Sequence, residues 1–158
     1  MSVTKTFLDS LATFAEIALK TSRNSSDTTD KFGTFLFAAF KFGKSKILLS
    51  SENSKSTSNF IAKLQPSIED CFENLVDDFH HNDITTYLIY RSGLEFIFSL
   101  TEAGQIEVDL KSERVIDIVE ELDDKISSYW KAPADPFGAT PHSIDLNGVP
   151  ESHTWWKE

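Results

Sequence analysis

The segment DDFHHND, residues 77–83, gathers three carboxylates and two histidines within seven residues. Carboxylate oxygens and imidazole nitrogens bind metal ions, and a spacing of three or four residues places two such side chains on one face of a helix. Asp77 with His80 or His81 is therefore a candidate metal site, and would be the core of a metal-dependent enzyme. The sequence indicates no third ligand elsewhere. The same residues also suit the polar end of a helix, where histidines complement the helix dipole, and we favour that interpretation.

Signatures of other catalytic chemistry are missing from the sequence. Cys71 is the only cysteine, and it lies among apolar residues at helical spacing, which predicts a core thiol rather than a nucleophile. There is no G-x-S-x-G elbow, no phosphate-binding loop and no dinucleotide-binding glycine pattern. The sequence accordingly predicts a protein that is not an enzyme and uses no cofactor or metal.

Charge is divided unevenly along the chain. The net charge is −10, yet residues 1–63 carry nine basic and five acidic side chains, whereas residues 64–130 carry four basic and sixteen acidic ones. Such an electrostatic field repels nucleic acid and anionic membranes, and it speeds the encounter with a basic partner. We therefore expect a basic protein as partner, and contact with neither nucleic acid nor membrane.

The acidic side chains gather on two predicted helices, on the side opposite the apolar residues. They recur every four residues, a spacing at which like charges destabilise a helix by a few tenths of a kcal/mol per pair. These stripes form either a partner-binding surface or two ordinary solvated faces. The candidate partner-binding residues are Glu69, Asp70, Glu73, Asp77, Asp78, Glu113, Asp117, Glu120, Glu121 and Asp124.

The chain ends in HTWWKE, with the adjacent tryptophans Trp155 and Trp156. Two neighbouring indoles near a chain end are hard to bury together, and tryptophan is enriched at binding hot spots. Both residues are therefore further partner-binding candidates. The alternative is that one ring anchors the C-terminal segment to the domain while the other stays half exposed.

Helical periodicity is clear in three segments. Apolar residues recur every three or four positions over 3–21, 68–80 and 113–129, which leaves one apolar face on each. Pro66 ends any earlier helix before the second segment, and Ser67 is its expected cap. Thirteen phenylalanines predict an aromatic-rich core.

Strands are predicted in two further regions. Residues 33–42 are compatible with a helix, but glycines bound this short run, and a hairpin over 33–51 is slightly favoured. Residues 84–110 are rich in β-branched and aromatic side chains that alternate with polar ones. With Ser92-Gly93 as a two-residue turn, they predict a three-strand antiparallel meander.

These elements predict an α+β fold in which helices pack on an antiparallel sheet. Residues 1–130 form the expected single domain, and residues 131–158 form a proline-rich extension. Because that extension still holds several large apolar residues, it is expected to pack on the domain. No apolar run approaches the roughly 20 residues of a membrane span, and we expect a cytoplasmic protein.

The segment FSLTEAGQIEVDL (98–110), preceded by a helix ending in LVDDFH, resembles small bacterial immunity proteins. Proteins of this kind bind and silence a polymorphic or contact-delivered toxin, often a nuclease. The similarity covers about residues 67–110 and is one of pattern, without a signature motif. It implies a stoichiometric inhibitor that is acidic because its target is basic, with carboxylates that mimic phosphates over the toxin's active cleft.

A second hypothesis also fits a small acidic α+β protein. A secretion-chaperone-like protein would be a homodimer that holds an extended effector segment on the outside of its sheet. The two hypotheses differ in assembly, because an immunity protein forms a heterodimer with its toxin.

Overall fold

The computed structural model describes residues 2–20, 25–131 and 144–156, and these residues form helices without any strand. The predicted α+β fold with an antiparallel sheet is therefore wrong. In chain order the elements are α1 (Val3–Lys20), α2 (Ser26–Ser45), α3 (Ser51–Asp77), the 3-10 turn η1 (His81–Asp83), α4 (Ile84–Glu102), α5 (Glu113–Lys131) and the 3-10 turn η3 (Thr154–Trp156).

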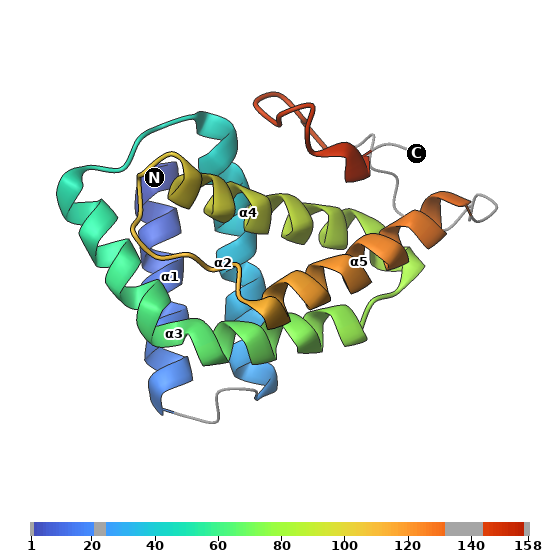
Figure 1. Ribbon diagram of the computed structural model, residues 1–158, viewed down its shortest axis with the longest axis horizontal. Coiled ribbons are helices and arrows are strands. Elements are labelled where there is room, and N and C mark those ends of the chain that lie inside the picture. The colour runs from blue at the N-terminus through green and yellow to red at the C-terminus, as the bar shows by residue number, and fades with distance from the viewer. Residues whose placement is uncertain (1, 21–24, 132–143, 157–158) are drawn as a thin grey trace.

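Helices α1 and α2 lie side by side, α3 crosses both, α4 packs across α2, and α5 lies against α3 and α4 (Figure 1). Helix α2 is central, because it packs against α1, α3 and α4. Phenylalanine rings fill the space between α1 and α2: Phe7 stacks on Phe42 with ring centroids 4.8 Å apart, and Phe14 meets Phe32 at 5.3 Å. The predicted aromatic-rich core is thus confirmed.

The two helices with one clear apolar face are confirmed. The structure places α1 at Val3–Lys20, against the predicted 3–21, and α5 at Glu113–Lys131, against the predicted 113–129. Both bury one stripe of apolar side chains and leave a polar face to solvent. The backbone N–H of Val115 donates to the Ser112 hydroxyl at 3.1 Å, which caps the start of α5.

Helix α4 occupies the region predicted as a meander over residues 84–110. It lies between α2 and α5, and the C-terminal segment covers part of it, so its buried residues are not confined to one stripe. A helix that is buried on several sides has no single apolar face, so its apolar residues do not recur at helical spacing. The sequence of its β-branched and aromatic residues then resembles that of strands. The predicted turn Ser92-Gly93 lies in the middle of α4, where Gly93 touches the backbone of Leu36. Residues 103–112 are irregular, so the predicted meander is wrong.

Helix α2 replaces the hairpin predicted over residues 33–51. The glycines that bound the short apolar run do not end a strand but lie inside the helix. Each provides room for an aromatic side chain of α4: Gly33 faces Tyr90, and Gly43 faces Phe96. The small size of these residues, rather than their backbone freedom, explains their positions.

Helix α3 is much longer than the predicted segment 68–80. Its N-cap is Ser50, whose hydroxyl accepts the N–H of Asn53 at 3.1 Å, and the helix runs from Ser51 through Pro66 to Asp77. Pro66 is exposed, so the carbonyl group that loses its helical hydrogen bond can be solvated. A proline therefore does not end this helix.

The described C-terminal residues 144–156 return to the helices (Figure 1). Lys44 Nζ donates to the backbone carbonyl of Asp145 at 2.6 Å, and Trp130 Nε1 donates to that of Trp155 at 2.9 Å. Residues 132–143, the first part of the predicted extension, lie outside the described residues. Among those described, no helix combines the length and apolar content needed to cross a bilayer.

Candidate functional site

Arg114 of α5 engages part of the acidic stripe on α3. Its guanidinium contacts Asp70 at 2.8 Å, forms a short ion pair with Glu73 and lies 3.9 Å from Glu69. Hydrogen bonds to Glu73 and Asp70 raise the pKa of Arg114. The Ser112 hydroxyl donates to Glu69 at 2.7 Å. Three of the candidate partner-binding carboxylates are thus held within the chain.

The outward side of α5 carries a separate group of carboxylates, here called the α5 acidic face. With 3.6 residues per turn, its members fall within about a third of the helix circumference, opposite the buried stripe. Within the described part of the chain, only one member has an ion-pair partner, which is Glu121 with Lys125 at 3.4 Å. The members are Glu113, Asp117, Glu120, Glu121 and Asp124, all exposed.

Two further candidate carboxylates, Asp77 and Asp78, lie at the end of α3. Lys125, the partner of Glu121, also donates from Nζ to the backbone carbonyl of Val76 at 2.7 Å. Helix α3 therefore ends against α5. Asp77 and Asp78 follow, both exposed, and they line a hollow with Asp30 and other residues at the start of α2.

The candidate metal ligands Asp77, His80 and His81 are not brought together as a ligand set. In the ranges that the structure describes, no group of three or more His, Cys, Asp or Glu side chains is arranged to hold a metal ion. The ring of His81 instead packs edge-on against Phe79 and Tyr129, with centroids 5.8 and 5.7 Å away. Because α3 ends at Asp77, the segment is the polar end of a helix.

A hollow of about 330 Å³ lies between α4 and α5, next to the α5 acidic face. Apolar side chains of Phe98, Val119 and Ile116 line it, and Ile116 is 43% exposed. Lys111 Nζ lies 5.0 Å from the centroid of the Phe98 ring, a cation–π distance. Glu120, a member of the acidic face, stands at the same hollow. The lining therefore combines apolar area with two acidic side chains, Glu95 and Glu120, and two basic ones, Arg91 and Lys111.

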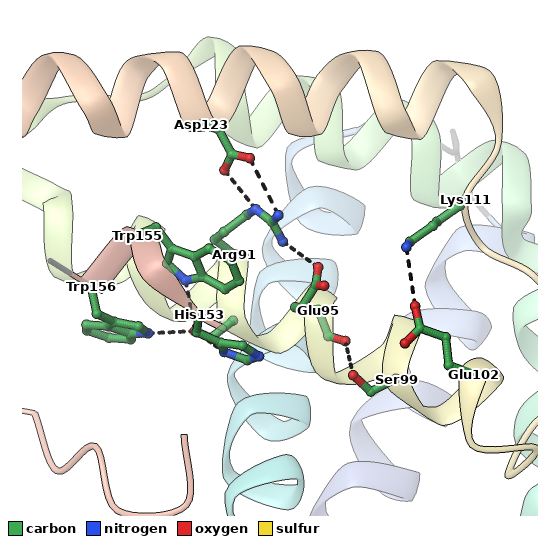
Figure 2. A network of polar contacts seen from close by, with 10 residues as sticks. Arg91, Glu95, Ser99, Glu102, Lys111, Asp123, His153, Trp155 and Trp156 are labelled. Carbon is green, nitrogen blue, oxygen red and sulfur yellow. Dashed lines mark hydrogen bonds and ion pairs between the residues drawn. The ribbon is translucent and has the colours of Figure 1, made fainter. Parts of the chain in front are cut away.

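Arg91 also lines this hollow, and its buried guanidinium is held by two carboxylates and one indole (Figure 2). Its Nε donates to Asp123 of α5 at 2.8 Å, and its Nη1 donates to Glu95 at 2.8 Å. The ring of Trp155 covers the guanidinium, with Cζ 4.1 Å from the ring centroid. These contacts compensate for the removal of the cation from water.

Three aromatic side chains contact the hydroxyl group of the neighbouring Ser92. The indole N–H groups of Trp155 and Trp156 donate to its Oγ at 3.0 and 2.6 Å, and His153 Nδ1 lies 3.1 Å from it. Indole N–H groups can only donate, so they use both lone pairs of the hydroxyl. The hydroxyl proton is then left for His153 Nδ1, which must be unprotonated.

A serine beside a histidine is also the beginning of a nucleophilic catalytic pair. Here the Ser92 oxygen is fully buried and its lone pairs are occupied. Burial, assisted by the nearby Arg91 and opposed by Glu95, lowers the pKa of His153 to about 4. A histidine with so low a pKa is a poor general base at neutral pH. We therefore interpret the cluster as the anchor of the C-terminal segment.

The candidate partner-binding residues Trp155 and Trp156 both belong to this anchor. Trp156 is buried and stacks on Phe40 of α2, with ring centroids 5.9 Å apart. Trp155 is half-buried over α4. Both rings therefore fasten the C-terminal segment to the helices, and Trp155 remains partly exposed.

The sequence predicts neither the anchor nor the α3–α5 ion pairs. Its pattern predicts Ser92 to be a turn residue, and His153 belongs to no motif. A signal did exist for Arg91 and Arg114, because they are two of only four basic residues in the acidic stretch 64–130. Isolated arginines among many carboxylates indicate internal ion pairs.

The Cys71 thiol is buried, as predicted for a core residue. Burial raises its pKa to about 11. At neutral pH it is therefore a thiol rather than a reactive thiolate.

Comparisons with protein-family models, with curated proteins and with solved structures find no match for this chain. The geometry of its own residues therefore carries the functional assignment.

Proposed function

We propose that this chain is a stoichiometric protein-binding inhibitor, an immunity protein that covers the basic cleft of a toxin with its α5 acidic face. One observation carries the proposal: among the described residues, four of the five carboxylates on this face have no ion-pair partner. Like charges at spacings of three and four residues destabilise the isolated helix. A basic partner would remove that repulsion and would be steered toward the face from a distance.

The apolar hollow beside the face supports the same proposal. Long-range charge mainly raises the association rate, whereas affinity depends on a few well-packed anchors. Ile116 and Phe98, which line the hollow, provide the apolar surface for such an anchor. An arginine of the partner could lay its aliphatic stem on Ile116 while its guanidinium reaches Glu120.

The proposed surface is smaller than the two stripes inferred from the sequence. It consists of the α5 acidic face alone, because Arg114 already engages the α3 stripe and because Asp77 and Asp78 line a hollow at the start of α2. The secretion-chaperone alternative requires a sheet on which an effector segment lies. The described residues contain no strand, and therefore lack the surface that this alternative needs. The encounter with the toxin is proposed to take place in the cytoplasm.

The decisive experiment uses the protein encoded by the neighbouring open reading frame as the candidate toxin. We expect the wild-type chain to restore growth of cells that produce this protein. The two purified proteins should form an equimolar complex whose association rate falls steeply as salt is added. The variant Asp117→Asn/Glu120→Gln/Asp124→Asn should associate at least about tenfold more slowly at low salt, as measured by stopped-flow fluorescence.

A matched control removes the same net charge elsewhere. Asp30→Asn/Glu52→Gln/Glu107→Gln changes three exposed carboxylates outside α5, and it should alter the association rate by less than about twofold. Equal slowing by both triple variants would mean that net charge, not the α5 acidic face, governs the encounter. Absence of any complex would refute the inhibitor proposal itself.

A further inference from the structure

A second hollow opens at another place in the bundle, where α2 and α4 both end, and has a volume of about 250 Å³. Its walls are mainly apolar and include Phe7, Phe42 and Leu100. A cavity of about 150 Å³ lined by aliphatic and aromatic residues is large enough for benzene. This hollow therefore has room for an aliphatic side chain.

Two exposed aliphatic side chains stand at the rim of this hollow. Leu48 is 74% exposed and Ile47 is 47% exposed, and both also line the hollow. The backbone that presents them is fixed on either side. Lys46 turns the chain with a left-handed φ of 58°, and the N–H of Leu49 donates to Gln105 Oε1 at 2.8 Å. The molecule thus presents a preformed apolar projection directly beside an apolar hollow.

We propose that a second copy of this chain covers this patch, with Leu48 of each copy inserted into the hollow of the other. A two-fold axis brings the same patch of two copies face to face, so each contact occurs twice. Such a dimer fills the hollow and removes the exposed aliphatic side chains from water in one step. A small apolar ligand would fill the hollow but would leave Leu48 largely in water.

The distribution of charge favours a second copy at this patch. Two molecules of net charge −10 repel each other in most orientations. The residues that line the hollow include Lys46 but no carboxylate. At its edges, Lys44 Nζ is held by the carbonyl of Asp145 at 2.6 Å, and Glu102 pairs with Lys111 at 3.5 Å. Two copies can therefore meet here without placing their α5 acidic faces against each other.

Sedimentation-velocity measurements over a wide concentration range test the proposal. The wild-type chain should show a reversible monomer–dimer equilibrium. Leu48→Ser should raise the dissociation constant at least about tenfold, because two leucine side chains lose their burial in each dimer. The matched control is Leu19→Ser, which makes the same change at a side chain of α1 that is 62% exposed. It should leave the dissociation constant within about twofold of wild type.

A second variant blocks the hollow instead of removing the projection. Ser99 is exposed and lines the hollow, and its hydroxyl donates to the Glu95 carbonyl of its own helix, at 3.0 Å. Ser99→Phe should therefore fill the hollow without disturbing the fold, and should also prevent dimerisation. A mixture of Leu48→Ser and Ser99→Phe chains restores one of the two contacts. This mixture should form heterodimers more tightly than either variant forms homodimers, as measured by native mass spectrometry.

Salt separates this proposal from the proposed inhibitor function. Added salt screens the repulsion between two acidic copies, so the homodimer should tighten with salt, whereas a complex with a basic toxin should weaken. A wild-type chain that stays monomeric at every concentration would overturn the dimer proposal. Equal weakening by Leu19→Ser, or no heterodimer in the mixture, would overturn it as well. None of these three results bears on the α5 acidic face.

Discussion

Ser92 offers one proton and two lone pairs, and side chains of the C-terminal segment use all three. This arrangement works only while His153 is neutral, since an imidazolium has no lone pair to accept the hydroxyl proton. The lowered pKa of His153, about 4, agrees with the neutral form. The cluster therefore couples the attachment of the C-terminal segment to a single protonation state.

The pH dependence of stability follows from this protonation state. His153 has a folded pKa of about 4, below the value of about 6.5 expected in the unfolded chain. Its contribution is fully present above pH ~6.5 and is lost progressively as the pH falls toward ~4, because the unfolded state binds the proton first. Between pH ~7 and ~4, we expect a loss of about 3 kcal/mol in the free energy of unfolding from this residue, measured by urea titration.

His153→Phe isolates this effect from the titration of the carboxylates. A phenyl ring can keep the stacking against Phe96 and Trp155, but it does not bind a proton. The variant should be less stable than wild type at neutral pH, and the difference should shrink on acidification. A difference that stays constant from pH ~7 to ~4 would contradict the assignment.

At the scale of elements, the contact between α2 and α4 depends on glycines inside the helices. A Cβ atom at Gly93 would overlap the backbone carbonyl oxygen of Leu36. Helix propensity alone predicts that Gly93→Ala stabilises the protein by up to about 1 kcal/mol. We expect the opposite, a destabilisation of about 1–3 kcal/mol, because backbone atoms must move apart. Urea unfolding at neutral pH measures the sign directly.

Gly33→Ala is the matched control for this prediction. There the added methyl group meets the hydroxyl group of Tyr90, the far end of a half-buried side chain that can turn away. The destabilisation should therefore be smaller than that of Gly93→Ala. If Gly93→Ala were as stable as wild type, the close approach of α4 to the α2 backbone would be refuted.

The helices that the sequence predicts correctly are those that expose one face to solvent. Helices α1 and α5 border the core on one side, so their apolar residues recur at helical spacing. Helix α4 is covered by several neighbours and has no such signal, and its glycine was interpreted as a turn. The serine-rich start of α3 has weak helix propensity, and the Ser50 cap and tertiary packing determine its length.

The candidate site likewise combines groups formed by residues close in sequence, which can be predicted, with groups formed by residues far apart in sequence, which cannot. The carboxylates of the α5 acidic face lie within one helix, and their common face could be predicted from spacing alone. The neutralisation of the α3 stripe could not, because Arg114 is 44 residues away from Asp70. The Ser92 anchor joins residues 61 to 64 positions apart. These groups come together only when the helices pack, and their contacts cannot be predicted from a single sequence.

At the scale of the whole molecule, the acidic charge has two different roles. The carboxylates of the α3 stripe join α3 to α5 through Arg114, whereas those of the α5 acidic face mainly repel one another. The first group contributes to the fold. The second group destabilises it slightly, which is common for residues that serve binding rather than stability.

These roles predict opposite effects of neutralisation on stability. Asp117→Asn/Glu120→Gln/Asp124→Asn removes repulsion at spacings of three and four residues, and should raise the free energy of unfolding by about 0.5–1 kcal/mol at low salt.

Asp70→Asn is the contrasting variant. Asp70 lies 2.8 Å from Arg114, and its side chain is only 13% exposed. Its neutralisation should lower the free energy of unfolding by about 1 kcal/mol, because the arginine loses a charged partner. Urea titrations of both variants at low and high salt measure these changes, and the gain of the triple variant should diminish as salt screens the repulsion. Destabilisation by the triple variant would mean that the α5 carboxylates hold the fold together, and would remove the reason for assigning them to a partner.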